Sequence, residues 1–85
     1  PAALLGKLAV DQSIEGQGLG SRLLIDALQR IHEVSEELAI KLVLVDAIDE
    51  EAKAYYLRFG FLAIPGHDLK LFLPIETVNA LFDGL

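Results

Sequence analysis

The sequence contains no cysteine and no methionine, and only seven of its 85 residues are basic. Without cysteine, neither a disulfide framework nor a thiolate metal site can form. The two histidines, His32 and His67, are too far apart in the sequence for a paired ligand motif, so we predict no metal. Thirteen acidic residues give a net charge of −6, which argues against broad binding of a phosphate backbone.

Long apolar runs are missing as well. No unbroken run exceeds four residues, as in residues 42–45, and a membrane span needs roughly 20. Residues 1–5 are too few and too uncharged for a signal peptide. A first-position proline in a chain without methionine fits removal of an initiator methionine or a trimmed start. We therefore expect a cytoplasmic protein that has no membrane contact.

The apolar content is high for so short a chain. Hydrophobic residues make up 53% of the sequence, and the mean hydropathy is +0.45. A domain of this size buries proportionally little of its surface when it folds alone. We therefore expect part of the apolar surface to be covered by a second copy of the chain or by a missing partner segment.

The first half of the chain predicts a strand, a loop and a long helix. Residues 4–10 are typical of a buried strand, and residues 11–20 form a turn-rich loop with three glycines. A helix is predicted over residues 20–38, because apolar side chains recur at three- and four-residue steps. His32 falls in its charged half, where we expect a solvated side chain.

The second half predicts a strand, a second helix, a hairpin and a short terminal helix. Residues 40–45 are rich in β-branched side chains, which indicates a strand buried on both faces. Asp49 is a plausible N-cap for the second helix, and Gly60 stands where a left-handed residue ends one. We expect Tyr55 on this helix to serve packing only.

The remaining predicted elements complete the order. They are a short strand over residues 61–64, a turn over 65–68, a strand over 69–73 and a helix over 75–82. The order is β-α-β-α-β-β with a terminal helix, an α/β (α+β) fold in one domain over residues 1–85. A strand–helix–strand start implies a right-handed crossover with parallel pairing, so the sheet is mixed.

A glycine-rich turn lies between the first strand and the long helix. Gly16, Gly18 and Gly20 remove the Cβ atoms that would keep an anion from the backbone. The following helix N-terminus offers unpaired amides and a favourable dipole, so the turn can hold a pyrophosphate. Tight packing explains the glycines equally well. A Walker A motif is excluded because Ser21-Arg22 follows the last glycine, and the spacing also departs from the Rossmann fingerprint.

The sequence around this turn resembles the acetyl-CoA motif of the GNAT N-acetyltransferase superfamily. The residues that carry the resemblance are Leu8-Ala9-Val10-Asp11 and Gly16-Gln17-Gly18-Leu19-Gly20-Ser21-Arg22-Leu23-Leu24. The resemblance implies that acetyl-CoA binds here as co-substrate. Its pyrophosphate would lie on the amides of Gln17, Gly18, Leu19, Gly20, Ser21 and Arg22, and its pantetheine arm on the backbone of Leu8, Ala9 and Val10. Glu15 departs from the pattern, which usually has Gln or Arg at that position.

A second motif further along the chain resembles the same family. Residues 47–61 are similar to the family's fourth helix, which ends in a (Phe/Tyr)-Tyr-x-x-x-Gly-Phe pattern. The similarity is greatest to the GNAT toxins of type II toxin–antitoxin pairs. In that group the position of Tyr56 supplies the general acid that protonates the leaving CoA thiolate. Without the resemblance, Tyr56 would be interpreted as a core aromatic.

The resemblance covers only the C-terminal half of the family's fold, and it leaves three hypotheses. The first is an N-acetyltransferase acting on a primary amine, either as a fragment of a longer enzyme or completed by oligomerisation. The second is a CoA-binding module without turnover, and the third is an interaction protein that binds no cofactor. The toxin resemblance implies aminoacyl-tRNA as acceptor and an antitoxin as partner.

Overall fold

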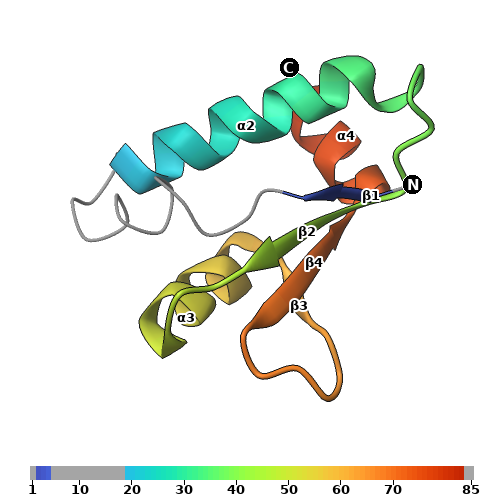
Figure 1. The fold of residues 1–85 in the computed structure, drawn as a ribbon. Helices are drawn as coiled ribbons and strands as arrows, with labels where there is room; N and C mark the ends of the chain where they lie inside the picture. Colours follow the sequence, from blue (N-terminus) through green and yellow to red (C-terminus); the bar gives the residue numbers. More distant parts are fainter. Residues whose placement is uncertain (1, 5–18, 84–85) are drawn as a thin grey trace.

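The computed structural model describes residues 2–4 and 19–83 of the chain (Figure 1). The order of elements is β1 (Ala2–Leu4), α2 (Leu19–Ser35), β2 (Leu42–Asp46), α3 (Glu50–Phe59), β3 (Leu62–Ala63), β4 (Lys70–Pro74) and α4 (Ile75–Asp83). This confirms the predicted β-α-β-α-β-β order with a terminal helix. The first strand begins two residues earlier than predicted, and residues 5–10 of the predicted strand lie outside the described residues.

The four strands form one mixed sheet in the order β1-β2-β4-β3. β1 and β2 pair in parallel, with Ala3 opposite Val43, as the predicted crossover through α2 requires. β2 and β4 pair antiparallel, with Val43 opposite Leu73. β3 and β4 form the predicted hairpin. The mixed α/β fold is therefore confirmed.

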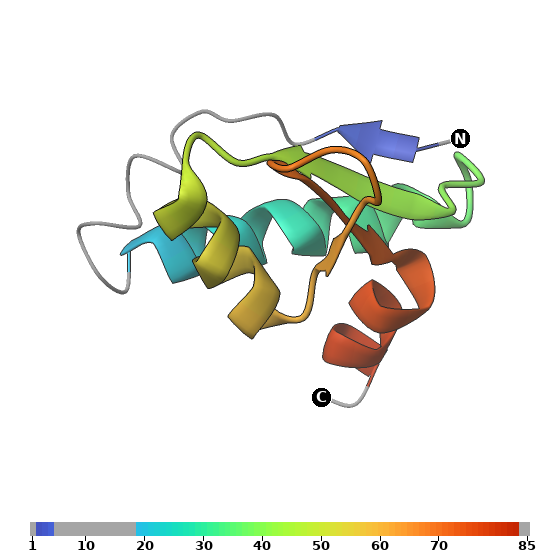
Figure 2. The same ribbon diagram turned by 90° about the horizontal axis from the view of Figure 1, so that it is seen from below.

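The core lies on one face of the sheet, where all three helices pack (Figure 2). The inward side chains of β2 and β4 are fully buried at Val43, Val45, Leu71 and Leu73. They form one cluster with Leu24 and Leu28 of α2, Ala52 and Tyr56 of α3, Phe61, and Val78 of α4.

The predicted burial of residues 40–45 on both faces is wrong. In β2, buried side chains alternate with half-buried ones, because Leu42 and Leu44 point to the face opposite the helices. Phe72 and Pro74 of β4 point to that face as well, and Leu62 of β3 is 50% exposed there. In the part of the chain that the structure describes, no helix packs on this apolar face.

α2 ends in a turn rather than in a continued helix. Its regular part stops at Ser35, three residues before the predicted end, and residues 36–39 form a hydrogen-bonded turn. The Ile40 amide donates to the Ser35 carbonyl at 2.9 Å, and the Ala39 amide to the Glu36 carbonyl at 3.2 Å. These two bonds define a Schellman motif, with Ala39 at φ 56° in its left-handed position.

The two ends of α3 are those that its sequence predicts. The Asp49 side chain accepts a hydrogen bond from the Ala52 amide at 2.8 Å, which confirms Asp49 as the N-cap. Gly60 ends the helix at φ 128°. The amides of Gly60 and Phe61 donate to the carbonyls of Leu57 and Tyr56 at 3.2 and 3.0 Å, so this helix also closes with a Schellman motif.

The predicted turn between β3 and β4 is present and tightly built. The His67 amide donates to the Ile64 carbonyl at 3.1 Å across Pro65 and Gly66. Gly66 has φ 83°. Proline followed by a glycine of positive φ identifies a type II turn, in which only glycine or asparagine suits the third position. The turn therefore fixes the position of the His67 backbone.

Candidate functional site

The start of α2 is the part of the predicted cofactor site that the structure describes. Leu19, Gly20, Ser21 and Arg22 form the first helical turn, which carries no acidic residue. The first amides of a helix have no partner inside it, and the dipole favours an anion there. These features suit a phosphate group. The other predicted contacts lie outside the described residues, namely Leu8, Ala9, Val10, Gln17 and Gly18.

Tyr56, the predicted general acid, is fully buried on α3. Its ring makes edge-to-face contacts with Phe61 and Tyr55, with centroids 5.3 and 5.7 Å apart. The predicted core packing of this aromatic is therefore present. Its role toward CoA stays a prediction.

Tyr55 carries a feature that the sequence did not signal. Its half-buried side chain packs against the core as predicted, but its buried hydroxyl has no hydrogen-bond partner among the described residues. An unpaired buried hydroxyl destabilises a fold by about 1–3 kcal/mol relative to a paired one. The hydrophobic pattern gives the position of a tyrosine ring and says nothing about its hydroxyl.

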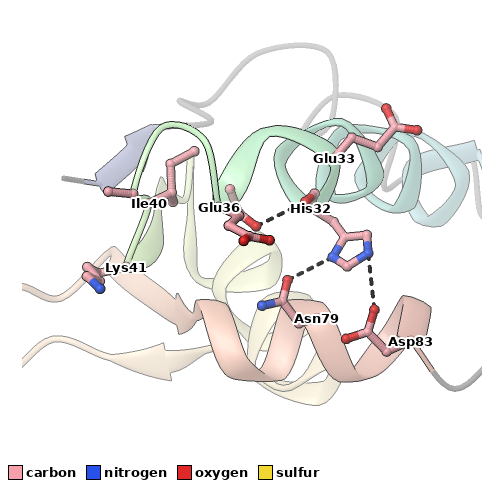
Figure 3. A pocket seen from close by; sticks show the side chains of 9 residues that line it. His32, Glu33, Glu36, Ile40, Lys41, Asn79 and Asp83 are labelled. Carbon is pink, nitrogen blue, oxygen red and sulfur yellow. Dashed lines mark hydrogen bonds and ion pairs between the residues drawn. The ribbon is translucent and has the colours of Figure 1, made fainter.

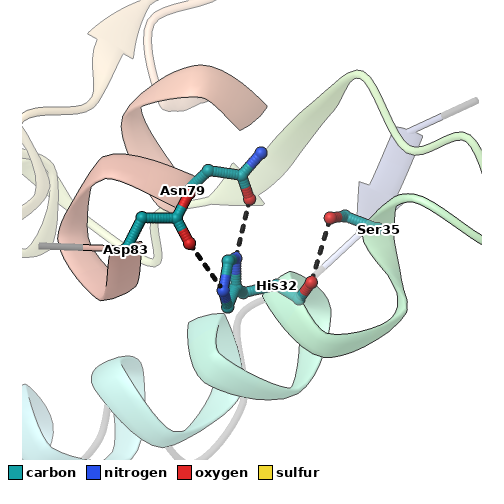
Figure 4. Close-up of polar contacts among 4 residues, drawn as sticks. All are labelled: His32, Ser35, Asn79 and Asp83. Carbon is teal, nitrogen blue, oxygen red and sulfur yellow. Dashed lines mark hydrogen bonds and ion pairs between the residues drawn. The ribbon is translucent and has the colours of Figure 1, made fainter. Parts of the chain in front are cut away.

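His32 does not lie in solvent, so its predicted solvated position is wrong. It bridges α2 and α4, and its Nδ1 lies 2.7 Å from Asn79 Oδ1 (Figure 4). Its Nε2 lies 3.4 Å from the Asp83 carboxylate, and its ring stacks on Phe82 with centroids 5.2 Å apart. The pattern of α2 alone places His32 among charged residues. It contains no information about α4, which covers this side of the helix in the folded chain.

These contacts form one wall of a groove of about 640 Å³ between α2 and α4 (Figure 3). Glu33, Glu36 and Lys41 add charged side chains, and Ile40 adds an apolar surface. The groove is at the C-terminal end of α2. The 17 residues of this helix rise about 1.5 Å each, so the groove is some 20 Å or more from the predicted phosphate position. It is therefore separate from the candidate cofactor site.

The described residues offer neither a metal site nor a membrane-spanning helix. Within residues 2–4 and 19–83, no three histidine, aspartate or glutamate side chains are grouped as metal ligands would be. No helix in the same ranges is both long and apolar enough to cross a membrane.

Comparison with known families decides the family. Residues 2–62 match the model of the acetyltransferase (GNAT) domain. This chain belongs to the GNAT family. The match includes β1, the glycine motif, α2, β2 and α3, and it ends at the first residue of β3.

Two related proteins are named as toxins. A tRNA-acetylating toxin of Mycobacterium tuberculosis is 40% identical over 81 residues, which is 95% of this chain and 49% of that protein. A probable toxin TacT of Sinorhizobium fredii is 39% identical over 88 residues, with the same shares covered. The GNAT chain therefore spans about half the length of these two relatives.

Solved structures of GNAT toxins share the fold. The KacTA–DNA complex superposes with a TM-score of 0.81 at 35% identity, covering 96% of this chain and 52% of that one. AtaT complexed with acetyl-methionyl-tRNAfMet gives 0.80 at 31% identity, with 96% and 49% covered. AtaTR bound with acetyl-CoA also gives 0.80 at 32% identity, with 93% and 51% covered.

Proposed function

We propose that this chain is the acetyl-CoA-binding half of an N-acetyltransferase that acetylates a primary amine, with the α-amine of aminoacyl-tRNA as acceptor. The observation that carries the proposal is the start of α2. A helix of 17 residues begins within the family's glycine motif and has no acid in its first turn. The relative from Mycobacterium tuberculosis acetylates tRNA, and AtaT is solved with an acetylated aminoacyl-tRNA, which supports this acceptor.

In this proposal acetyl-CoA supplies an acetyl group held as a thioester. The amides of Gln17, Gly18, Leu19, Gly20, Ser21 and Arg22 bind its pyrophosphate, and the backbone of Leu8, Ala9 and Val10 pairs with the pantetheine arm. Tyr56 donates the proton that the leaving sulfur needs, because a positioned hydroxyl in a closed site acts as a general acid. Solved structures of AtaT and KacT include variants with a tyrosine replaced by phenylalanine, which fits a functional tyrosine in this group.

We also propose that the domain is completed by a second copy of this chain or by an N-terminal half such as the longer relatives have. The apolar sheet face formed by Leu42, Leu44, Phe72 and Pro74 supports this, since no described helix covers it. Light scattering of the purified chain at micromolar concentration is expected to give a dimer or larger. A monodisperse monomer would exclude self-completion.

The decisive experiment is a calorimetric titration of the chain with acetyl-CoA. We expect binding by the unaltered chain and none by Gly18→Glu, because the new carboxylate repels the pyrophosphate. Gln29→Glu is the matched control, since it adds the same charge at an exposed position of α2 and is expected to bind normally. Absence of binding by the unaltered chain would refute the proposed cofactor site.

Acetyl transfer to an amine then separates the enzyme from its alternative. Tyr56→Phe is expected to keep acetyl-CoA binding and to lose at least 100-fold in transfer rate, at the low end of what a general acid contributes. The second candidate function is a CoA-binding or interaction module without turnover. Binding without transfer by the unaltered chain identifies that module.

The proposed partners follow from the same relatives. AtaT has been solved with the C-terminus of its antitoxin AtaR. We propose that this chain also binds an antitoxin. Co-purification with the product of the neighbouring gene tests this proposal.

A further inference from the structure

Two adjoining hollows of about 330 and 390 Å³ lie where β2 ends and β4 begins. Both are lined by Asp46, His67 and Lys70, and the larger one has apolar walls from Leu44 and Ile64. We call them together the β2–β4 hollow. It combines an apolar wall with the two carboxylates of Asp46 and Asp68, an imidazole and an ammonium group.

Asp46 and Lys70 carry opposite charges at this hollow, and in the described part of the chain they form no direct ion pair. Asp46 and Lys70 are direct partners in the antiparallel register, where Cβ atoms are typically about 5 Å apart. Among the described residues, however, only His32 and Asp83 approach within ion-pair distance. The Asp46 carboxylate and the Lys70 ammonium are therefore both available to a ligand.

The rim of the hollow is held by backbone hydrogen bonds. The type II turn that precedes His67 fixes one side. The Ile64 amide donates to the Lys70 carbonyl at 3.0 Å, and the Ala47 amide donates to the Leu69 carbonyl at 2.8 Å. The backbone that carries these polar side chains is thus held by hydrogen bonds, so a ligand has less backbone to order when it binds.

The hollow lies at the functional end of the sheet. α2 runs antiparallel to β1 and β2, so its N-terminal end and the carboxyl end of β2 lie toward the same side of the molecule, at the left in Figure 1. Ligands of open α/β sheets bind outside the carboxyl ends of the strands. A group bound in the hollow is therefore on the same edge as the proposed phosphate position.

We propose that the β2–β4 hollow binds the 3′ aminoacyl end of the RNA acceptor. Asp46 accepts a hydrogen bond from the α-amine, and Lys70 with His67 contacts a backbone phosphate near the 3′ end. Ile64 contacts the apolar part of the terminal residue. The mixed charges suit a ligand that has an amine and a phosphodiester side by side, whereas a plain polyanion would meet the acids Asp46 and Asp68 as well. This inference rests on the proposed function and names its substrate-binding residues.

The test is binding of an RNA minihelix whose 3′ end carries an amide-linked, non-hydrolysable amino acid. We expect Lys70→Gln to weaken binding about tenfold and to lower the salt dependence by about 0.7–0.9 in the log–log slope, the amount for one lost phosphate contact. Lys41→Gln removes the same charge at the groove between α2 and α4 and is expected to leave binding unchanged.

A second comparison isolates Asp46. Asp46→Asn is expected to weaken the amine-bearing minihelix about tenfold and to leave a minihelix without that amine unaffected. The inference would be overturned if Asp46→Asn bound the amine-bearing minihelix as tightly as the unaltered chain does. It would also be overturned if Lys70→Gln and Lys41→Gln changed RNA binding by the same amount. No RNA binding by the unaltered chain would overturn it too.

Acetyl-CoA titrations keep the two proposals apart. All three variants are expected to bind acetyl-CoA as the unaltered chain does, because none belongs to the proposed cofactor contacts. Intact acetyl-CoA binding with no effect of Asp46→Asn and Lys70→Gln on RNA refutes the hollow alone. Loss of acetyl-CoA binding by the unaltered chain refutes the proposed cofactor site, and the minihelix comparison still decides whether the hollow binds RNA.

Discussion

The C-terminal ends of α2 and α3 close with the same pair of backbone hydrogen bonds but with different side chains. In α3 the left-handed residue is Gly60, and the next residue, Phe61, packs its ring on Tyr56 one turn earlier. In α2 the left-handed residue is Ala39. The residue that corresponds to Tyr56 is there Ser35, whose hydroxyl donates to the His32 carbonyl at 3.0 Å.

The difference has consequences for what each end contacts. The α3 end is apolar and couples its Schellman motif to the core and to the proposed general acid. The α2 end adjoins the groove with Glu33, Glu36 and the His32–Asp83 contact, and it is polar. The same backbone motif thus packs against the core at the end of α3 and adjoins a polar surface at the end of α2, because the side chains at the two ends differ.

The largest expected effects come from truncating the buried apolar residue that follows the left-handed position at each end, which is Phe61 in α3 and Ile40 after α2. Phe61→Ala is expected to lower the free energy of unfolding by about 3–5 kcal/mol, since Phe61 is 1% exposed and fills the core beside Tyr56. Ile40→Ala is expected to lower the free energy of unfolding by a smaller amount, about 2–3 kcal/mol. The loss is smaller because one side of the Ile40 side chain lines the groove and is not packed against the core. Urea unfolding followed by far-UV circular dichroism measures both. Equal losses would mean that the two ends contribute alike to the core.

Substitutions at the two left-handed positions, Gly60 and Ala39, test how much backbone strain each helix end contains. Gly60→Ala is expected to destabilise the fold by about 1–2 kcal/mol because a Cβ at φ 128° is strained, although no heavy atom lies within 4 Å of it. Ala39→Gly is expected to stabilise the fold by about 0.5–1 kcal/mol, since the strain that it removes outweighs the freedom that glycine adds to the unfolded chain. Thermal unfolding of both variants should shift the midpoint in opposite directions; a shift of the same sign contradicts the assignment.

A third pair of substitutions concerns the N-terminal end of α3. Asp49→Ala removes the acceptor for the Ala52 amide and is expected to destabilise the fold by about 1 kcal/mol. Asp68→Ala is the control, because this exposed aspartate is outside a helix, and a change within about 0.5 kcal/mol is expected. If both substitutions have the same effect in urea unfolding, Asp49 does not stabilise α3 as an N-cap.

The local signals predicted α3 and the hairpin well. Asp49, Gly60 and the Pro65-Gly66 pair each act through their own backbone, so a short stretch of sequence contains the reason for each cap and turn. The end of α2 carried no such signal, because an alanine at positive φ is held there by the surrounding structure. The predicted helix therefore ran on to residue 38.

The candidate site divides in the same way. The glycine motif and Tyr56 were identified from a local resemblance, and the family match confirms the family while leaving the roles of these residues as proposals. Asp46, His67 and Lys70 were not selected from the sequence, since an acid at a strand end and a histidine in a turn have no fixed spacing. Only the pairing of β2 with β4 brings them to one hollow.

From the sequence alone came the order of the elements, the caps of α3, the turn between β3 and β4 and the family, because these depend on neighbouring residues or on short motifs. The tertiary structure decided which face of β2 is covered, where His32 lies and which charges meet at the end of the sheet. Those features depend on contacts between residues far apart in the chain, such as His32 with Asn79 across 47 positions. Hydrophobic periodicity gives the direction of a side chain relative to its own element, and the partner on that side is fixed only when the elements pack.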